Sequence, residues 1–221
     1  MRHKVSYRLR NDLRRLFFLC FSVMLCCMVH NANAQKSPKR AMLRATRYSS
    51  LPSGYTQVGN TQLYYKQYST AIDMIGYYNG YYYSSTYSDN GYKLSVQVGN
   101  NSATRVDCLN GTTTNGVTVQ PSVEQQGDLA RVCYAVTNNN AEDVVISLGT
   151  HADVMIGSND AAPISRRIDT FGQTYGLTMM DGNGAQLCVL FGSGLTGVTA
   201  VSDFWFGYFN LNSEPFKMVG N

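Results

Sequence analysis

The stretch that decides the fold is residues 128–156, DLARVCYAVTNNNAEDVVISLGTHADVMI. Before the three asparagines, Val132, Tyr134 and Val136 occupy every second position. After the asparagines, the even-numbered positions from 144 to 156 are apolar, except for Thr150. A repeat of two residues predicts β-strands, and the asparagine cluster predicts the turn that joins them. We therefore expect an antiparallel strand pair whose second strand is long, with a kink at Gly149.

Turn signals of the same kind recur along the chain from Tyr55 onward. Pairs such as Asn79-Gly80 and Asp181-Gly182 recur at intervals of about 10 to 20 residues, and short runs rich in Val, Ile, Tyr and Thr lie between them. No stretch after residue 34 sustains a helical period, although residues 68–78 could form one or two helical turns. This pattern predicts an all-β fold, an antiparallel β-sandwich, of which a larger two-sheet supersandwich is one form.

The N-terminus has the pattern of a secretory signal peptide. Six Lys and Arg residues lie within residues 1–15, and a 14-residue apolar run follows at 16–29. That run is shorter than the roughly 20 residues that a transmembrane helix requires. Ala32-Asn33-Ala34 then supplies the small residues that signal peptidase accepts. We predict cleavage after Ala34, and hence a secreted, periplasmic or cell-surface protein with no transmembrane helix in the mature chain.

The predicted organisation has three parts: a signal peptide (1–34), a basic flexible leader (35–54) and a β-sandwich domain (55–221). Positive and negative residues are unevenly distributed along the chain. From Tyr48 onward, seven Lys and Arg stand against thirteen Asp and Glu, which gives the body of the protein a net charge of −6. Because an acidic surface repels the phosphate backbone, we expect no nucleic-acid partner.

Asn90-Gly91 predicts a two-residue β-hairpin. On its outgoing arm, Leu94, Val96 and Val98 alternate with polar residues. If the preceding arm pairs with this one, Tyr83 and Tyr87 face the core, because residues opposite one another share a face. Tyr82 then lies on the outer face, where its ring could bind a ligand.

Removal of the signal peptide would leave three cysteines, Cys108, Cys133 and Cys188, of which Cys133 and Cys188 fall within predicted strands. One disulfide between strands and three buried thiols are both open alternatives. The chain contains no C-x-x-C motif, and its Asp-rich and Asn-rich turns lack the spaced acidic ladder of a calcium loop. We therefore predict no metal and no cofactor.

His151 is the only histidine after the signal segment, and Asp153 follows two residues later. In a regular strand both would project from one face and could form an oriented general base. Arg166 and Arg167 could bind an anionic group nearby. A hydrogen-bonded structural pair explains the same residues, and no Gly-x-Ser-x-Gly elbow or second histidine supports catalysis.

Near the C-terminus, residues 203–210 read DFWFGYFN, in which the odd-numbered and the even-numbered positions are both mostly apolar. This is typical of a central strand covered on both sides, or of a strand that offers rings such as Trp205 to a ligand. Either earlier strands flank it, the region of residues 55–65 among them, or the domain is incomplete here and a partner adds a strand.

The strand rhythm of residues 128–164 resembles that of the secreted bacterial β-sandwiches grouped with galactose mutarotase. The resemblance implies the two-sheet fold that sugar epimerases, lyases and many non-catalytic secreted proteins share. Mutarotases resemble one another in using two histidines and a glutamate around the sugar, whereas the mature chain has His151 alone. The resemblance therefore implies the fold without the catalytic site.

These observations predict a secreted or cell-surface binding module without catalytic activity, with a glycan or a protein as its ligand. The first alternative is a carbohydrate-active enzyme of epimerase, lyase or hydrolase type that uses His151 and Asp153. The second alternative is a structural or assembly module. A concave pocket around the His151 and Asp153 side chains would favour the enzyme.

Overall fold

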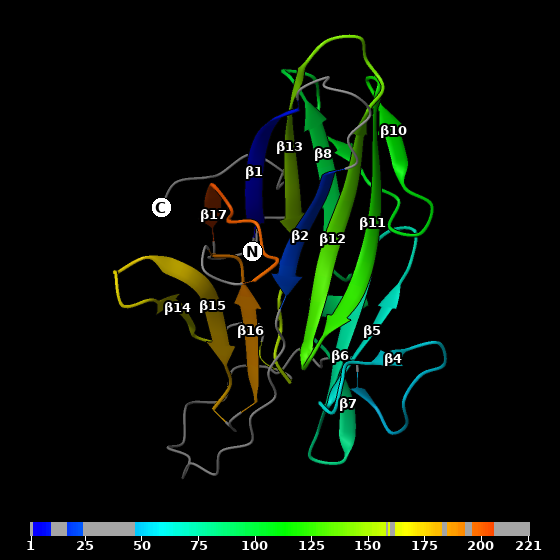
Figure 1. Cartoon of the computed structure of the whole chain (residues 1–221). Helices are drawn as coiled ribbons and strands as arrows, with labels where there is room; N and C mark the ends of the chain where they lie inside the picture. Colours follow the sequence, from blue (N-terminus) through cyan, green and yellow to red (C-terminus); the bar gives the residue numbers. More distant parts are fainter. Residues whose placement is uncertain are drawn as a thin grey trace.

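The computed structural model describes residues 2–9, 17–23, 47–157, 159, 162–182, 185–192 and 196–205. These residues are almost entirely β-structure, with one short 3-10 turn at η1 (Tyr87–Asp89). All strand pairs are antiparallel (Figure 1). The predicted all-β, antiparallel fold is thus confirmed. Within the described ranges, no helix is long and apolar enough to cross a membrane.

Two sheets form the main sandwich. The first has the order β17-β1-β13-β8-β9, with β17 (Asp203–Trp205), β1 (Arg2–Leu9), β13 (Val144–His151), β8 (Lys93–Val98) and β9 (Thr104–Arg105). The second has the order β10-β11-β12-β2, with β10 (Thr112–Thr114), β11 (Val117–Gln126), β12 (Leu129–Asn138) and β2 (Phe17–Val23). The β11–β12 hairpin and β13 form the long axis of the molecule in Figure 1.

Two smaller sheets complete the fold. One has the order β14-β15-β16, with β14 (Ile164–Ile168), β15 (Thr174–Met180) and β16 (Gln186–Leu190), and β16 lies beside β2. The other, at the lower right in Figure 1, has the order β3-β7-β6-β5-β4, with β3 (Arg47–Tyr48), β7 (Tyr81–Ser84), β6 (Ile72–Tyr78), β5 (Leu63–Gln67) and β4 (Thr56–Gln57).

The core follows the predicted alternation. Val132, Tyr134 and Val136 on β12 are buried, as are Ile146 and Leu148 on β13. The Tyr134 hydroxyl lies 2.8 Å from Thr150 Oγ1 and so links the two sheets of the sandwich. Burial of apolar side chains from both inner faces is the largest favourable contribution to the free energy of packing two such sheets.

The three cysteines that follow the signal segment, Cys108, Cys133 and Cys188, are buried free thiols. Cys133 and Cys188 do lie on strands, β12 and β16, but in different sheets. Burial raises the pKa of Cys108 to about 11. Of the two alternatives for these cysteines, the structure has the buried thiols.

The predicted long strand is shorter than its sequence pattern suggests. β13 ends at His151, and its register with β8 runs through Gly149 without a bulge, so the predicted kink is wrong. Beyond it, Val154 and Ile156 make only isolated bridges, to Thr86 and Asn159. Val154, Met155 and Ile156 are all buried, so the segment still lies against the core although its backbone partners change.

The hairpin predicted at Asn90-Gly91 is wrong. Asn90 has φ −69° and ψ −15°, whereas a type I′ turn needs positive φ at both central residues. Tyr92 instead exchanges backbone hydrogen bonds with Ile72, and β7 and β8 belong to different sheets. Gly91 therefore marks a crossing between sheets. Leu94, Val96 and Val98 are buried as expected, while Tyr83 and Tyr87 are only half-buried.

At the N-terminal side, strand structure begins before Tyr55. Arg47 and Tyr48 form β3, which pairs with β7, so the end of the predicted flexible leader is part of a sheet. Residues 35–46 and the predicted cleavage site lie outside the described residues. Within the predicted signal peptide, β1 pairs with β13 and β2 pairs with β12.

At the C-terminal side, β17 pairs with β1 only, among the described strands, and is the last strand of its sheet. Among the described strands, β17 therefore has a neighbour on one side only. Residues 206–221, which include most of that pattern, lie outside the described residues. The region of residues 55–65, the predicted neighbour, belongs instead to the sheet of β4 and β5.

Candidate functional site

The clearest surface feature is a set of tyrosines on one face of the β3-β7-β6-β5-β4 sheet, which we call the tyrosine face. Its members are Tyr48, Tyr55, Tyr64, Tyr68, Tyr77 and Tyr82. The Tyr82 ring lies 4.8 Å from the Tyr77 ring and 5.5 Å from the Tyr64 ring, centroid to centroid. In register, Tyr82 stands between Tyr77 on β6 and Tyr48 on β3. These rings therefore form one contiguous aromatic layer.

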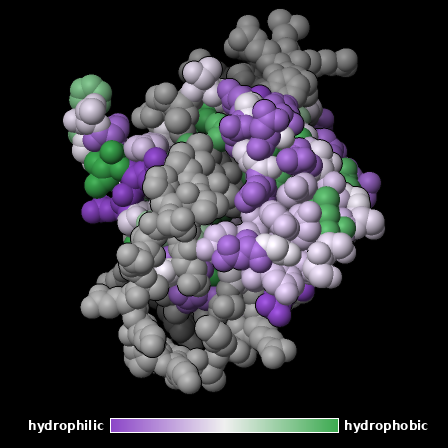
Figure 2. Space-filling view, turned by 90° about the horizontal axis from the view of Figure 1, so that it is seen from below, coloured by the Kyte–Doolittle hydropathy of each residue, from purple (hydrophilic) through white to green (hydrophobic). Residues whose placement is uncertain are grey.

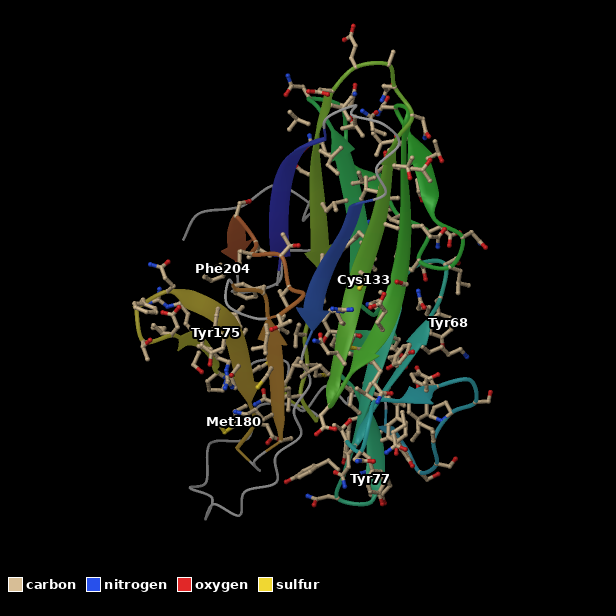
Figure 3. All side chains as sticks on the ribbon, viewed as in Figure 1. Tyr68, Tyr77, Cys133, Tyr175, Met180 and Phe204 are labelled. Carbon is tan, nitrogen blue, oxygen red and sulfur yellow. The ribbon has the colours of Figure 1, made fainter. Side chains whose placement is uncertain are left out.

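The rings are accessible. Tyr68 is 40% exposed, and the other members of the tyrosine face are half-buried. Figure 2 views this end of the molecule from below, and the surface over β4 to β7, on the right, is mostly pale and weakly polar. Tyr68 and Tyr77 mark the extent of the tyrosine face in Figure 3. An aromatic layer that is half-buried and half-exposed presents ring faces and hydroxyl groups to a ligand.

A buried carboxylate supports these rings from below. Asp73 on β6 is 2% exposed. It accepts hydrogen bonds from the Tyr55 hydroxyl and from the Met74 amide, the latter at 2.9 Å. Burial raises the pKa of Asp73, and these two hydrogen bonds oppose that rise. The negative charge of Asp89 raises it further.

A second carboxylate holds another ring. The Tyr48 hydroxyl donates to Asp89 Oδ2 at 2.7 Å, which ties β3 to the turn η1. Burial and the neighbouring carboxylates raise the pKa of Tyr48 and of Tyr55. Both phenols therefore stay protonated at neutral pH and remain hydrogen-bond donors.

Two cations border the sheet. Lys66 Nζ lies 4.9 Å from the centroid of the Tyr68 ring and 5.7 Å from that of Tyr55, and it donates to the Ser53 carbonyl at 3.0 Å. On the opposite face, the Arg47 guanidinium lies 4.5 Å above the Tyr81 ring. Cation–π contacts of this kind fix the orientation of exposed rings.

A pocket lies behind the tyrosine face, on the other side of β6 and β7. It is small, with a volume of about 50 Å³. Tyr78 and Tyr83 form one wall, and Met155, Ile156 and Leu187 form another. The pocket is largely apolar, and no His, Lys, Arg, Asp or Glu lines it among the residues that the structure describes. It therefore offers shape and apolar contact rather than acid–base chemistry.

The His151 and Asp153 pair does not line this pocket. His151 is buried at the end of β13, opposite Lys93 of β8. Asp153 lies beyond the strand, and its backbone carbonyl accepts a hydrogen bond from the Tyr87 amide. Because the strand ends between them, the regular alternation that would place both side chains on one face does not reach Asp153.

The other predicted ligand-binding residues are far from the tyrosine face. Arg166 is exposed on β14, and Arg167 donates to Tyr175, Thr178 and Cys188 at 3.2–3.4 Å. The hydrogen bond to Tyr175 is the main reason that the pKa of Arg167 is raised. Figure 3 places Tyr175 on the opposite side of the molecule from Tyr77.

Trp205 lies on β17, in register with Arg2 of β1. The structure thus places Tyr82, the arginine pair and Trp205 in three different sheets.

Sequence reasoning named Tyr82 but not Asp73, Asp89 and Lys66, which contact other tyrosines of the tyrosine face. Asp73 did leave a signal, because it interrupts the otherwise apolar run of residues 71–75, AIDMI. A carboxylate within a buried strand needs hydrogen-bond partners. One of the partners of Asp73 is the Tyr55 hydroxyl, from the residue at which sequence analysis began the first strand.

Among the residues with described side chains, no three His, Cys, Asp or Glu groups lie close enough together to bind a metal ion. Comparison with known proteins found no family model, no curated protein and no solved structure that matches this chain.

Proposed function

We propose that the protein is exported, loses residues 1–34, and acts outside the cytoplasm as a binding module without catalytic activity. Its ligand is a glycan, which the tyrosine face binds. The observation that carries this proposal is the layer formed by Tyr64, Tyr77 and Tyr82, in which the Tyr82 ring contacts both of the others and all three are partly exposed.

The chemistry of the tyrosine face supports this choice of ligand. The C–H faces of a pyranose ring pack on aromatic rings, while phenol groups and Lys66 can exchange hydrogen bonds with sugar hydroxyls. The rings are positioned before the ligand arrives, because Asp73 and Asp89 bind two of the phenols. Such preorganisation lowers the entropic cost of binding.

A protein ligand is the second candidate, and the composition of residues 77–90, YYNGYYYSSTYSDN, favours it. Tyr, Ser, Gly and Asn dominate this segment, as they do in antibody binding loops, where tyrosine supplies contact area and the small residues supply adaptable hydrogen bonds.

The test is a glycan array probed with the exported product of the full-length gene, followed by titration of each retained glycan. Tyr82→Ser should weaken binding about ten-fold, since loss of one aromatic contact costs about 1.5 kcal/mol. Tyr82→Phe, which keeps the ring, should retain most of the affinity.

Tyr81→Ser is the matched control, because Tyr81 lies on the same strand but faces the other side of the sheet. It should bind as the natural protein does. Thermal unfolding of each variant separates lost binding from lost folding. If no glycan is retained, or if Tyr81→Ser and Tyr82→Ser lose equal affinity, the tyrosine face is not a glycan site.

A further inference from the structure

The tyrosine face is longer than a single sugar, and its length follows from the strand register. Tyr77 on β6 stands level with Gln62, because the Tyr77 amide donates to the Gln62 carbonyl at 2.8 Å. From position 62 to Tyr68, just past the end of β5, the backbone covers about 20 Å at about 3.3 Å per residue. Figure 3 labels both ends of this distance, Tyr77 at the lower end and Tyr68 above it.

Four rings and one cation follow one another along this length. Tyr77 and Tyr82, in register on β6 and β7, lie at one end. The Tyr64 ring comes next, 5.5 Å from that of Tyr82. Lys66 lies two residues further along β5, and its Nζ atom is 4.9 Å from the centroid of the Tyr68 ring at the other end. All five side chains are at least partly exposed, and we call them the aromatic track.

Lys66 supplies polar contacts in the middle of the aromatic track. Its ammonium group has three N–H donors, and in the part of the chain that the structure describes the Ser53 carbonyl accepts one of them, at 3.0 Å. The remaining donors can reach hydroxyl and ring oxygens of a sugar that lies over Lys66. The Tyr64 and Tyr68 rings on either side offer apolar surfaces to the C–H faces of the sugars before and after it.

The arrangement of the rings distinguishes between classes of glycan. The Tyr82 ring is inclined by 52° to Tyr77 and by 70° to Tyr64, so these rings do not share a plane. A crystalline polysaccharide presents one flat face, which can lie only on coplanar rings. A single terminal sugar is best held by a concave pocket, and the pocket described above lies on the other side of β6 and β7. The aromatic track therefore suits one chain that turns between its sugars.

On the basis of the proposed glycan function, we infer that the tyrosine face binds the interior of a single extended polysaccharide chain, which runs along the strands from Tyr77 to Tyr68. Neighbouring ring centroids are 4.8–5.5 Å apart, close to the length of one pyranose unit, so a track of about 20 Å holds about four sugars. Because the aromatic track is open at both ends, the terminal sugars of the chain do not matter for recognition.

The test measures affinity against chain length. The exported product of the full-length gene is titrated by calorimetry with cello-, xylo-, manno-, malto- and chito-oligosaccharides of one to six sugars. In a series that binds, affinity should rise with each added sugar up to about four and then level off, because further sugars pass beyond the track. The hexasaccharide should bind at least about ten-fold more tightly than the disaccharide, which contacts fewer rings.

Variants at the two ends test whether one chain spans both. Tyr68→Ser and Tyr77→Ser should each weaken hexasaccharide binding about ten-fold. A disaccharide should lose affinity in at most one of them, because it cannot reach both ends. Tyr68→Phe, which keeps the ring, should bind as the natural protein does. Tyr81→Ser, on the other side of the sheet, is the matched control and should leave the length dependence unchanged.

Thermal unfolding of each variant first establishes that it is folded. Equal affinity for disaccharides and hexasaccharides would overturn the inference while leaving the glycan function intact. Hexasaccharide binding that depends on only one of the two ends would overturn it too, as would retention of the protein on microcrystalline cellulose or crystalline chitin. Failure of the folded natural protein to bind any of the five series would contradict the proposed glycan function, and the inference with it.

Discussion

Asp73 shows how much of the candidate site depends on a single buried group. It lies between two fully buried apolar residues, Ile72 and Met74, and its carboxylate holds Tyr55 in place at the tyrosine face. Burial of a charge is unfavourable unless hydrogen bonds compensate for it. Here they compensate only partly, because the pKa of Asp73 remains raised.

This raised pKa predicts a pH dependence of stability. The native state binds the Asp73 proton more tightly than the unfolded state, whose carboxyl titrates near pH 3.9. The contribution of Asp73 to the free energy of unfolding should therefore rise as pH falls through the native pKa, and decline as pH rises through it. Urea unfolding between pH 3.5 and 8 should show this slope in the natural protein and lose it in Asp73→Asn.

Asp107 provides a control, because its carboxyl group should give stability the opposite pH dependence. The amides of Leu109 and Asn110 donate to its carboxylate and lower its pKa, so its contribution is lost as pH falls. Asp107→Asn should therefore change the pH profile in the opposite direction. Parallel profiles for the natural protein and Asp73→Asn would show that Asp73 does not titrate differently on folding.

At the scale of the element, the Asn90-Gly91 segment shows that one turn sequence can serve two structures. It has the residues of a tight hairpin, yet it carries the chain from η1 into β8, in another sheet. Gly91 has φ +64°, and a Cβ atom there would lie 2.8 Å from Ala71 Cβ and 2.9 Å from the Ile72 carbonyl oxygen. The crossing thus depends on glycine both for its backbone conformation and for its close approach to β6.

Gly91→Ala should therefore destabilise the protein by about 2–4 kcal/mol, the sum of an unfavourable positive φ and a clash with backbone. Gly80→Ala is the matched control, since Gly80 also has positive φ (+81°) but has no neighbouring atom within 4 Å of the added Cβ. It should cost about 1 kcal/mol. Denaturant unfolding measures both, and equal losses would show that close approach contributes nothing at Gly91.

At the scale of the whole molecule, the chain carries two conflicting requirements for its first 34 residues. Their basic start and apolar run predict removal on export, whereas the folded chain uses β1 and β2 as strands beside β13 and β12. Both can hold only if the fold rearranges after processing.

Processing itself gives a direct prediction. Edman sequencing of the exported protein should begin at Gln35, since signal peptidase requires small residues at its −3 and −1 positions. Ala34→Arg should block cleavage and leave the precursor in the membrane fraction. Asn33→Arg, at the −2 position that is not recognised, should be processed as usual. Recovery of intact Met1 from the exported natural protein would contradict the prediction.

The local pattern of the sequence was enough to determine the fold class. Alternation identified Val132, Tyr134 and Val136, and Leu94, Val96 and Val98, as core residues, and all six are buried. It did not anticipate that Cys133 and Ser95, of the opposite parity, are buried as well.

Only the tertiary structure decided which strands become neighbours. The predicted hairpin at Asn90-Gly91 and the predicted long strand beyond His151 both assumed that adjacent segments continue in one sheet. Backbone pairing joins distant segments, such as β13 with β8, and the side-chain hydrogen bond between Tyr55 and Asp73 joins two others. The apolar face of a strand can be identified from its own sequence, whereas pairing depends on the whole chain.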